Sequence, residues 1–191
     1  MNNIKSILLV GVGGQGTILA SKILSEGLVS VGYDVKMSEI HGMSQRGGSV
    51  STQIRYGDKV YSPIIGLGEA DVIVAFEKME ALRWVGYLKK GGRMVINNHE
   101  IPSVPILMGS VQYPQDIEGA LQEKIDILEF KAADLAKELG NPRVMNIVLL
   151  GALVKAVNIE SVDWDGVIRR NVKKGFEELN VSAFHAGYAI R

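Results

Sequence analysis

The sequence contains no cysteine, and this absence excludes several kinds of chemistry at once. Without a thiolate, the chain forms no disulfide, holds no iron–sulfur cluster through cysteine ligands and has no cysteine nucleophile. The chain also lacks an excess of charge of either sign, because 21 Lys and Arg residues balance 21 Asp and Glu residues. Nucleic acids and anionic membranes both attract a basic excess gathered on one face, so we expect neither as a partner.

Long apolar runs are scarce as well. One of the longest, residues 147–157, is much shorter than the roughly 20 residues that a membrane-spanning helix needs. Residues 1–5 lead directly into an apolar strand pattern and do not resemble a signal peptide. We therefore expect a cytoplasmic protein. With 191 residues, 47 % of them hydrophobic, the chain suffices for a single domain over residues 1–191 with a substantial core.

Apolar periodicity predicts repeated strand–helix units in the first two thirds of the chain. The expected strands are 4–10, 35–40, 49–56, 71–76, 93–97 and 125–130, with a short edge strand at 111–113. The expected helices are 17–31, 78–88, 132–139, 143–157, 164–179 and 182–190, and a turn is expected at Gly91–Gly92. This pattern predicts an α/β fold: a Rossmann-like, mostly parallel sheet flanked by helices, with a helical C-terminal third.

A glycine loop follows the first expected strand and opens the first expected helix. Its sequence is Gly11-Val12-Gly13-Gly14-Gln15-Gly16-Thr17. In this context, glycines let backbone N–H groups and a helix N-terminus approach a phosphate, so the loop is a candidate cofactor-binding site. Glu39, near the end of the second strand, is placed to hold a ribose. The same glycines would equally allow a tight strand-to-helix turn with no ligand, and both interpretations stay open.

A polar, glycine-rich run at residues 41–48 links the second and third expected strands, at the same end of the sheet as the glycine loop. A dinucleotide-binding domain normally has a turn into its second helix here. The candidate residues are His41, Ser44, Gln45, Arg46, Gly47 and Gly48. Arg46 can bind a phosphate or carboxylate through two hydrogen bonds, Ser44 and Gln45 can donate to an oxygen, and His41 is the available acid or base. A substrate channel and an interface with a partner subunit explain the run equally well.

Three other sets of residues favour structural roles. His99 and His185 are far apart in the sequence and lack carboxylates at ligand spacing, so we expect no metal site. Asn146 and Gly151 lie on an apolar helix, where they permit close packing or cap a neighbouring chain end. The helix expected at 164–179 has a cationic face that is typical of solvent exposure.

The motifs Gly-x-Gly-Gly-Gln-Gly-Thr at 11–17, His-Gly-x-Ser-Gln-Arg-Gly-Gly at 41–48 and Asn-x-x-x-Leu-Gly-Ala at 146–152 occur together. This combination resembles the gamma subunit, or gamma domain, of 2-oxoacid:ferredoxin oxidoreductases, and the resemblance covers the whole chain. The stretches 80–97 and 101–114 are most similar to the beta subunit of indolepyruvate:ferredoxin oxidoreductases.

The resemblance implies a subunit of an enzyme that oxidatively decarboxylates a 2-oxoacid, here indolepyruvate or another aryl pyruvate. The products are an acyl-coenzyme A, CO2 and electrons that pass to ferredoxin. Thiamine diphosphate, Mg²⁺ and iron–sulfur clusters would belong to a large catalytic alpha subunit, joined with this chain in a heterodimer, and coenzyme A would be the co-substrate. This chain would be inactive alone.

The sequence agrees with that division of labour, because it lacks the usual thiamine motif as well as cysteine. Gly57-Asp58 is followed by Lys59, and Asn97-Asn98 comes too late and ends a strand. Two other functions stay open. One is a free-standing nucleotide-binding oxidoreductase, and the other is a noncatalytic interaction module of the same fold.

Overall fold

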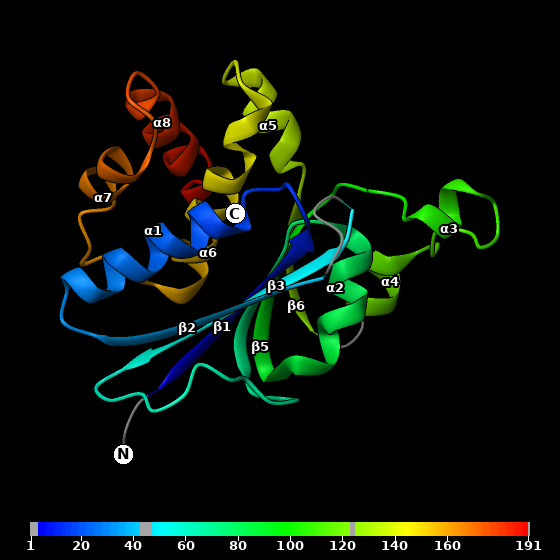
Figure 1. Ribbon diagram of the computed structural model, residues 1–191, viewed down its shortest axis with the longest axis horizontal. Coiled ribbons are helices and arrows are strands. Elements are labelled where there is room, and N and C mark those ends of the chain that lie inside the picture. The colour runs from blue at the N-terminus through cyan, green and yellow to red at the C-terminus, as the bar shows by residue number, and fades with distance from the viewer. Residues whose placement is uncertain (1–3, 43–46, 123–124, 191) are drawn as a thin grey trace.

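The computed structural model describes residues 4–42, 47–122 and 125–190, which form an α/β fold around one six-stranded sheet (Figure 1). The strands are β1 Lys5–Val12, β2 Asp34–His41, β3 Ser49–Gly57, β4 Ala70–Ala75, β5 Leu88–Asn97 and β6 Asp126–Phe130. Their order in the sheet is β2-β3-β1-β4-β5-β6. The pairs β1–β4, β4–β5 and β5–β6 are parallel, whereas β3 runs antiparallel to both of its neighbours. The predicted fold class is therefore confirmed.

The direction of β3 brings the two sequence motifs together. β2 turns back into β3, so that His41 pairs with Val50, and β3 begins beside the end of β1, where Val12 pairs with Ser49. The glycine loop after β1 and the residues flanking the polar run consequently lie at the same end of the sheet, as predicted.

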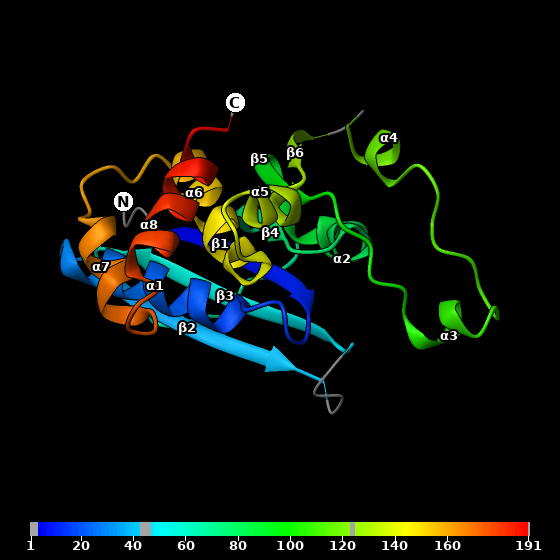
Figure 2. The same ribbon diagram turned by 90° about the horizontal axis from the view of Figure 1, so that it is seen from above.

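Helices cover both faces of the sheet (Figure 2). One face is covered by α1 Thr17–Ser30, α5 Ala132–Glu138, α6 Met145–Val157, α7 Trp164–Asn171 and α8 Glu177–Tyr188. The other face is covered in part by α2 Lys78–Trp84 and α4 Ile117–Gln122, and the short helix α3 Val104–Leu107 lies outside both layers. Among the described residues, no helix has the length and hydrophobicity needed to span a lipid bilayer.

Two glycines allow α6 and α8 to pack backbone against backbone. An ideal Cβ atom added to Gly151 would lie 2.0 Å from the carbonyl oxygen of Phe184, and one added to Gly187 would lie 1.8 Å from that of Val148. The prediction that Gly151 permits close packing is thus confirmed. Because α6 is almost entirely buried, this contact holds the helical C-terminal third against the sheet.

Some expected elements differ from the structure. Residues 111–113 form no strand and lie instead on an irregular segment. Gly91–Gly92 lies inside β5 at a shift of register against β4, where Gly91 has φ +77°, so the expected turn is a bulge within the strand. The helix expected at 164–179 ends at Asn171, where the C-cap residue Val172 is extended with ψ 163°, and α8 begins at Glu177 after Gly175, which has φ +89°.

Candidate functional site

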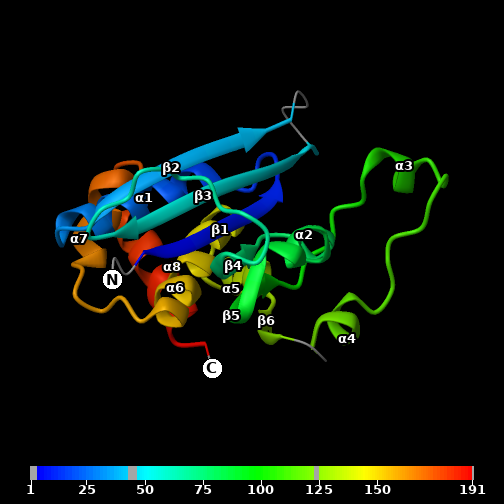
Figure 3. The same ribbon diagram turned by 90° about the horizontal axis from the view of Figure 1, so that it is seen from below.

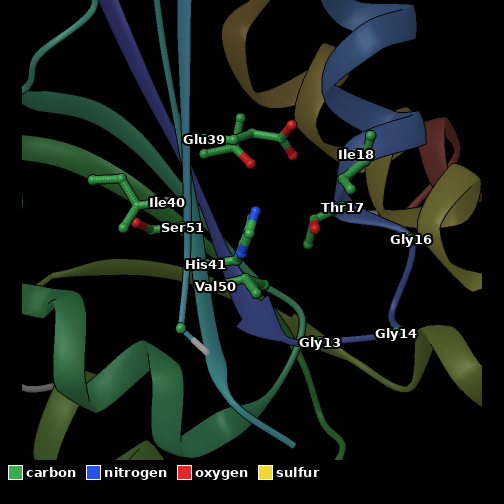
Figure 4. A pocket seen from close by; sticks show the side chains of 12 residues that line it. Gly13, Gly14, Gly16, Thr17, Ile18, Glu39, Ile40, His41, Val50 and Ser51 are labelled. Atoms are coloured by element: carbon green, nitrogen blue, oxygen red, sulfur yellow. The ribbon is translucent and has the colours of Figure 1, made fainter. Parts of the chain in front are cut away.

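A cavity of about 500 Å³ opens at the end of β1, between the glycine loop and the β2–β3 pair. The lining residues are Gly13, Gly14, Gly16, Thr17 and Ile18 on one side and Glu39, Ile40, His41, Gly42, Val50, Ser51 and Thr52 on the other. Figure 4 shows Glu39 and His41 pointing from β2 toward the start of α1, where Thr17 and Ile18 lie. Most of the predicted loop residues and His41 therefore share one cavity.

The wall formed by the start of α1 suits an anion. Gly16 is the N-cap residue, with φ +80°, and offers no side chain to the free N–H groups of the first helical turn. The first turn, Thr17 to Ala20, carries no charged side chain. A helix N-terminus of this kind has a partial positive charge and N–H donors directed at the cavity, the arrangement that binds phosphate groups.

The opposite wall has a different character. Glu39 is exposed on β2 and its carboxylate faces the cavity. It can therefore accept hydrogen bonds from hydroxyl groups of a ligand, and it would repel an anionic group placed beside it. The next described element after β2 is the antiparallel strand β3. Among the described residues, the lining of the cavity therefore includes no second helix of the kind that completes a dinucleotide site.

Gln15 holds the glycine loop in shape from inside. Its Oε1 accepts a hydrogen bond from the N–H of Val12 at 2.7 Å, and its Nε2 donates to the carbonyl oxygen of Phe76 at 2.8 Å. Gly11 must lack a side chain because its Cβ would lie 2.7 Å from that same Oε1 and 2.9 Å from the Cβ of Phe76. Of the predicted cofactor ligands, Gln15 and Gly11 thus shape the loop, and the other four line the cavity.

The loop is also held from α6 and from β3. Nδ2 of Asn146 donates to the carbonyl oxygen of Gly16 at 3.1 Å, so Asn146 caps a neighbouring chain segment as predicted. The N–H of Gly13 donates to the carbonyl oxygen of Gly48 at 2.9 Å, which ties the loop to the end of the polar run. Gly47 lies next to Gly48 and is exposed. Ser44, Gln45 and Arg46 lie outside the described residues.

A second cavity, of about 490 Å³, lies on the other side of the glycine loop. It is lined by Gly14, Gln15, Gly16, Leu19, His99, Ile101, Pro142, Arg143, Met145 and Asn146. The guanidinium of Arg143 and the imidazole of His99 give this cavity donors for an anionic or carbonyl group. No pattern in the sequence indicates this cavity, because its walls come from segments that are far apart in the chain.

Two buried carboxylates at the end of β4 were also missed. Glu77 is the N-cap residue of α2, and its Oε2 accepts from the N–H of Glu80 at 2.9 Å. Glu80 in turn accepts hydrogen bonds from Ser49 Oγ at 2.5 Å, Arg83 Nε at 3.1 Å and Trp84 Nε1 at 3.2 Å. Acidic residues directly after an apolar strand indicate a helix start, because a carboxylate is favoured at a helix N-terminus, and this signal could have identified both residues.

Asn97 has a structural role at the same end of the sheet. Its Nδ2 donates to the carbonyl oxygen of Phe76 at 3.0 Å, beside the bond from Gln15, and its Oδ1 accepts from the N–H of Ala132 at 3.1 Å. These contacts give Asn97 a structural role, because they connect the end of β5 to Phe76 after β4 and to the first residue of α5. Within the described part of the chain, no group of three or more His, Asp or Glu residues could hold a metal ion.

Comparisons with known proteins agree with this architecture. The family model described as pyruvate ferredoxin/flavodoxin oxidoreductase matches residues 6–190. Indolepyruvate oxidoreductase subunit IorB of Pyrococcus horikoshii is 40 % identical over 188 residues, which cover 95 % of this chain and 93 % of that protein. The gamma subunit of a keto/oxoacid ferredoxin oxidoreductase from Geobacter sulfurreducens superposes with a TM-score of 0.71 at 25 % identity, covering 96 % of both chains.

A longer protein contains the same fold. The 2-oxoglutarate:ferredoxin oxidoreductase from Magnetococcus marinus, with 2-oxoglutarate, coenzyme A and succinyl-CoA bound, superposes with a TM-score of 0.76 at 21 % identity. The match covers 98 % of this chain but 31 % of the Magnetococcus chain, so there the fold is one part of a larger polypeptide. From the family match over nearly its whole length and the close relatives, this chain belongs to the pyruvate ferredoxin/flavodoxin oxidoreductase family.

Proposed function

We propose that this chain is the small subunit of an indolepyruvate or aryl-pyruvate:ferredoxin oxidoreductase. The observation that carries the proposal is the 40 % identity to an indolepyruvate oxidoreductase subunit over 95 % of the chain. A large catalytic subunit would hold thiamine diphosphate, Mg²⁺ and iron–sulfur clusters, and would pass electrons to ferredoxin. This chain has no cysteine with which to hold such a cluster.

The role proposed for this chain is to complete the binding site for coenzyme A. Its diphosphate would lie against the N–H groups at the start of α1, in the cavity lined by Gly13, Gly14, Gly16 and Thr17. Coenzyme A is present in the Magnetococcus marinus structure of the same fold. On sequence grounds, Ser44, Gln45 and Arg46 would face the substrate channel. His41 lines the cavity, and we assign it no proton transfer, because the aminopyrimidine of thiamine diphosphate can move protons itself.

Reconstitution tests this proposal. The purified chain is expected to be colourless and inactive, and to restore indolepyruvate- and coenzyme A-dependent dye reduction when mixed with the large subunit from its host. Comparison of indolepyruvate, pyruvate and 2-oxoglutarate in the same assay identifies the substrate class. If the mixture were no more active than the large subunit alone with any of these oxoacids, the proposed function would be wrong.

Ile18 offers a sharper test of the coenzyme A site. Ile18 is exposed in the first turn of α1, where a carboxylate is tolerated or even favoured by the helix. Ile18→Glu is expected to raise the KM for coenzyme A about tenfold, because a negative charge near the diphosphate costs roughly 1.4 kcal/mol at a partly exposed site.

The matched control is Ile18→Gln, because a glutamine side chain has nearly the same shape as the glutamate of the test variant and carries no charge. It is expected to change the KM for coenzyme A less than about threefold, and both variants should retain the wild-type KM for the oxoacid. Equal effects of Glu and Gln would mean that charge at this position is irrelevant, and the diphosphate would have to bind elsewhere.

One observation favours a second candidate, a free-standing nucleotide-binding oxidoreductase. Glu39 faces the glycine loop across the cavity, as a ribose-binding carboxylate would. This alternative requires that the isolated chain bind NAD or NADP, measured by calorimetry, and that Glu39→Gln abolish that binding. A third candidate, a noncatalytic module, would stabilise the complex without changing turnover or coenzyme A affinity. The single domain over residues 1–191 and the cytoplasmic location stay predictions from the sequence.

A further inference from the structure

An irregular arm leaves the body of the protein after β5 and returns before α4. We use the word arm for residues Ile101 to Tyr113, which include the short helix α3. Figure 3 shows the arm projecting from the end of the sheet at which β1, β2 and β5 end. It is therefore on the same side of the molecule as the glycine loop, and Ile101 at its base lines the cavity next to that loop.

One buried carboxylate holds both ends of the arm. Oε1 of Glu77 accepts hydrogen bonds from the N–H of Ile101 at 3.1 Å and from the hydroxyl of Tyr113 at 2.5 Å. The same hydroxyl accepts from the N–H of Met79 at 3.0 Å. Burial, together with the hydrogen bond to Glu77, raises the pKa of Tyr113, so the phenol keeps its proton at neutral pH. The base of the arm is consequently fixed in position.

The outer part of the arm, in contrast, exposes apolar side chains to solvent. The exposed fractions are 67 % for Val104, 73 % for Leu107, 76 % for Met108 and 53 % for Val111. Val104 and Leu107 are the two ends of the short helix α3, Met108 is its C-cap residue, and Val111 follows in the irregular segment. None of residues 101–115 is charged, although 22 % of the whole chain is. A surface with apolar side chains and no charge is typical of the core of a stable protein interface.

We propose that the arm docks into an apolar groove of the large catalytic subunit, which buries Val104, Leu107, Met108 and Val111. This inference rests on the proposed function. Two observations favour the large subunit over a second copy of this chain. The arm begins at a second cavity that shares Gly14 and Gly16 of the glycine loop with the proposed coenzyme A site, and in the Magnetococcus marinus enzyme the matched fold is joined to further polypeptide of the same enzyme.

The test compares two doubly substituted chains for binding to the large subunit purified from the same host. In Leu107→Lys with Met108→Lys, two charges are placed at the exposed part of the arm. The control, Val29→Lys with Leu67→Lys, changes two exposed apolar residues on α1 and on the segment before β4, away from the arm. All four side chains are largely exposed, so both variants should fold, which circular dichroism and urea unfolding verify.

The arm variant is expected to raise the Kd for the large subunit about 100-fold, or about tenfold for each anchor side chain lost. The control should stay within about threefold of the wild type. Equal affinities of arm variant and wild type would overturn the arm inference and leave the proposed function standing. If the arm variant instead disrupted only a homodimer of this chain, seen by sedimentation, a second copy would be the occupant. If the wild-type chain did not bind the large subunit, the proposed function would be wrong, and the arm inference that rests on it would be wrong as well.

Discussion

Replacement of Gly187 by alanine is expected to lower the free energy of unfolding by more than about 3 kcal/mol. The new Cβ would lie 1.8 Å from the carbonyl oxygen of Val148, and backbone atoms of a buried helix cannot move aside as a flexible side chain can. The two helices would have to separate, which opens gaps in the apolar packing around Phe184 as well.

Urea unfolding of Gly187→Ala and Gly151→Ala, followed by circular dichroism, measures this effect. Gly86→Ala is the matched control, because among the described residues the nearest atom to its added Cβ is Cδ2 of Leu67 at 3.8 Å, an ordinary contact. We expect the control to change stability by less than about 1 kcal/mol. A similar midpoint for Gly86→Ala and Gly187→Ala would show that α6 and α8 do not pack at the distance described.

Glu77→Ala is expected to cost about 4 kcal/mol of stability. Glu77 is fully buried and accepts three hydrogen bonds, from Ile101, Tyr113 and Glu80. Its loss leaves buried donors without an acceptor, at roughly 1–3 kcal/mol each. Glu77→Gln should cost less, about 2 kcal/mol, because the amide oxygen can still accept on one side while the amide nitrogen faces a donor on the other.

The control for Glu77 is Glu69→Ala. Glu69 also accepts a hydrogen bond from a backbone N–H, that of Gly66, but it lies in an exposed turn, so its loss should cost less than about 1 kcal/mol. Because Glu77 holds both ends of the arm, Glu77→Ala should also speed cleavage of residues 101–113 by chymotrypsin under native conditions. Unchanged cleavage together with an unchanged unfolding midpoint would contradict the role of Glu77 as the anchor of the arm.

The β1–loop–α1 unit could be predicted from the sequence because its determinants are local. An apolar run, closely spaced glycines and a helical repeat specify a strand, a tight turn and a helix without reference to the rest of the chain. The common location of the glycine loop and the polar run also followed from the strand pattern and is confirmed by the pairing of Val12 with Ser49. The prediction of a strand at 111–113 was wrong, because extended residues form a strand only where a neighbouring strand accepts their hydrogen bonds.

The hydrogen bonds that hold the site together could not be predicted from the sequence. Gln15 was predicted as a cofactor ligand from its place in the loop, yet its amide bonds to Phe76, 61 residues away. Glu77 reaches Ile101 and Tyr113, which are 24 and 36 residues further along the chain. Such contacts depend on the register of the sheet and on how helices pack, which no local pattern encodes.

The sequence by itself therefore determined the fold class, the glycine loop, the absence of cysteine ligands and the family. The tertiary structure alone decided that Glu39 and His41 face the start of α1 across one cavity and that Gln15 is held inside the loop. It also decided that one buried carboxylate, Glu77, holds both ends of an uncharged arm that begins at the second cavity. The physical reason is the separation of the interacting residues along the chain. Hydrophobic periodicity and turn chemistry act between near neighbours, whereas a site at the end of a sheet is assembled from distant segments that only folding brings together.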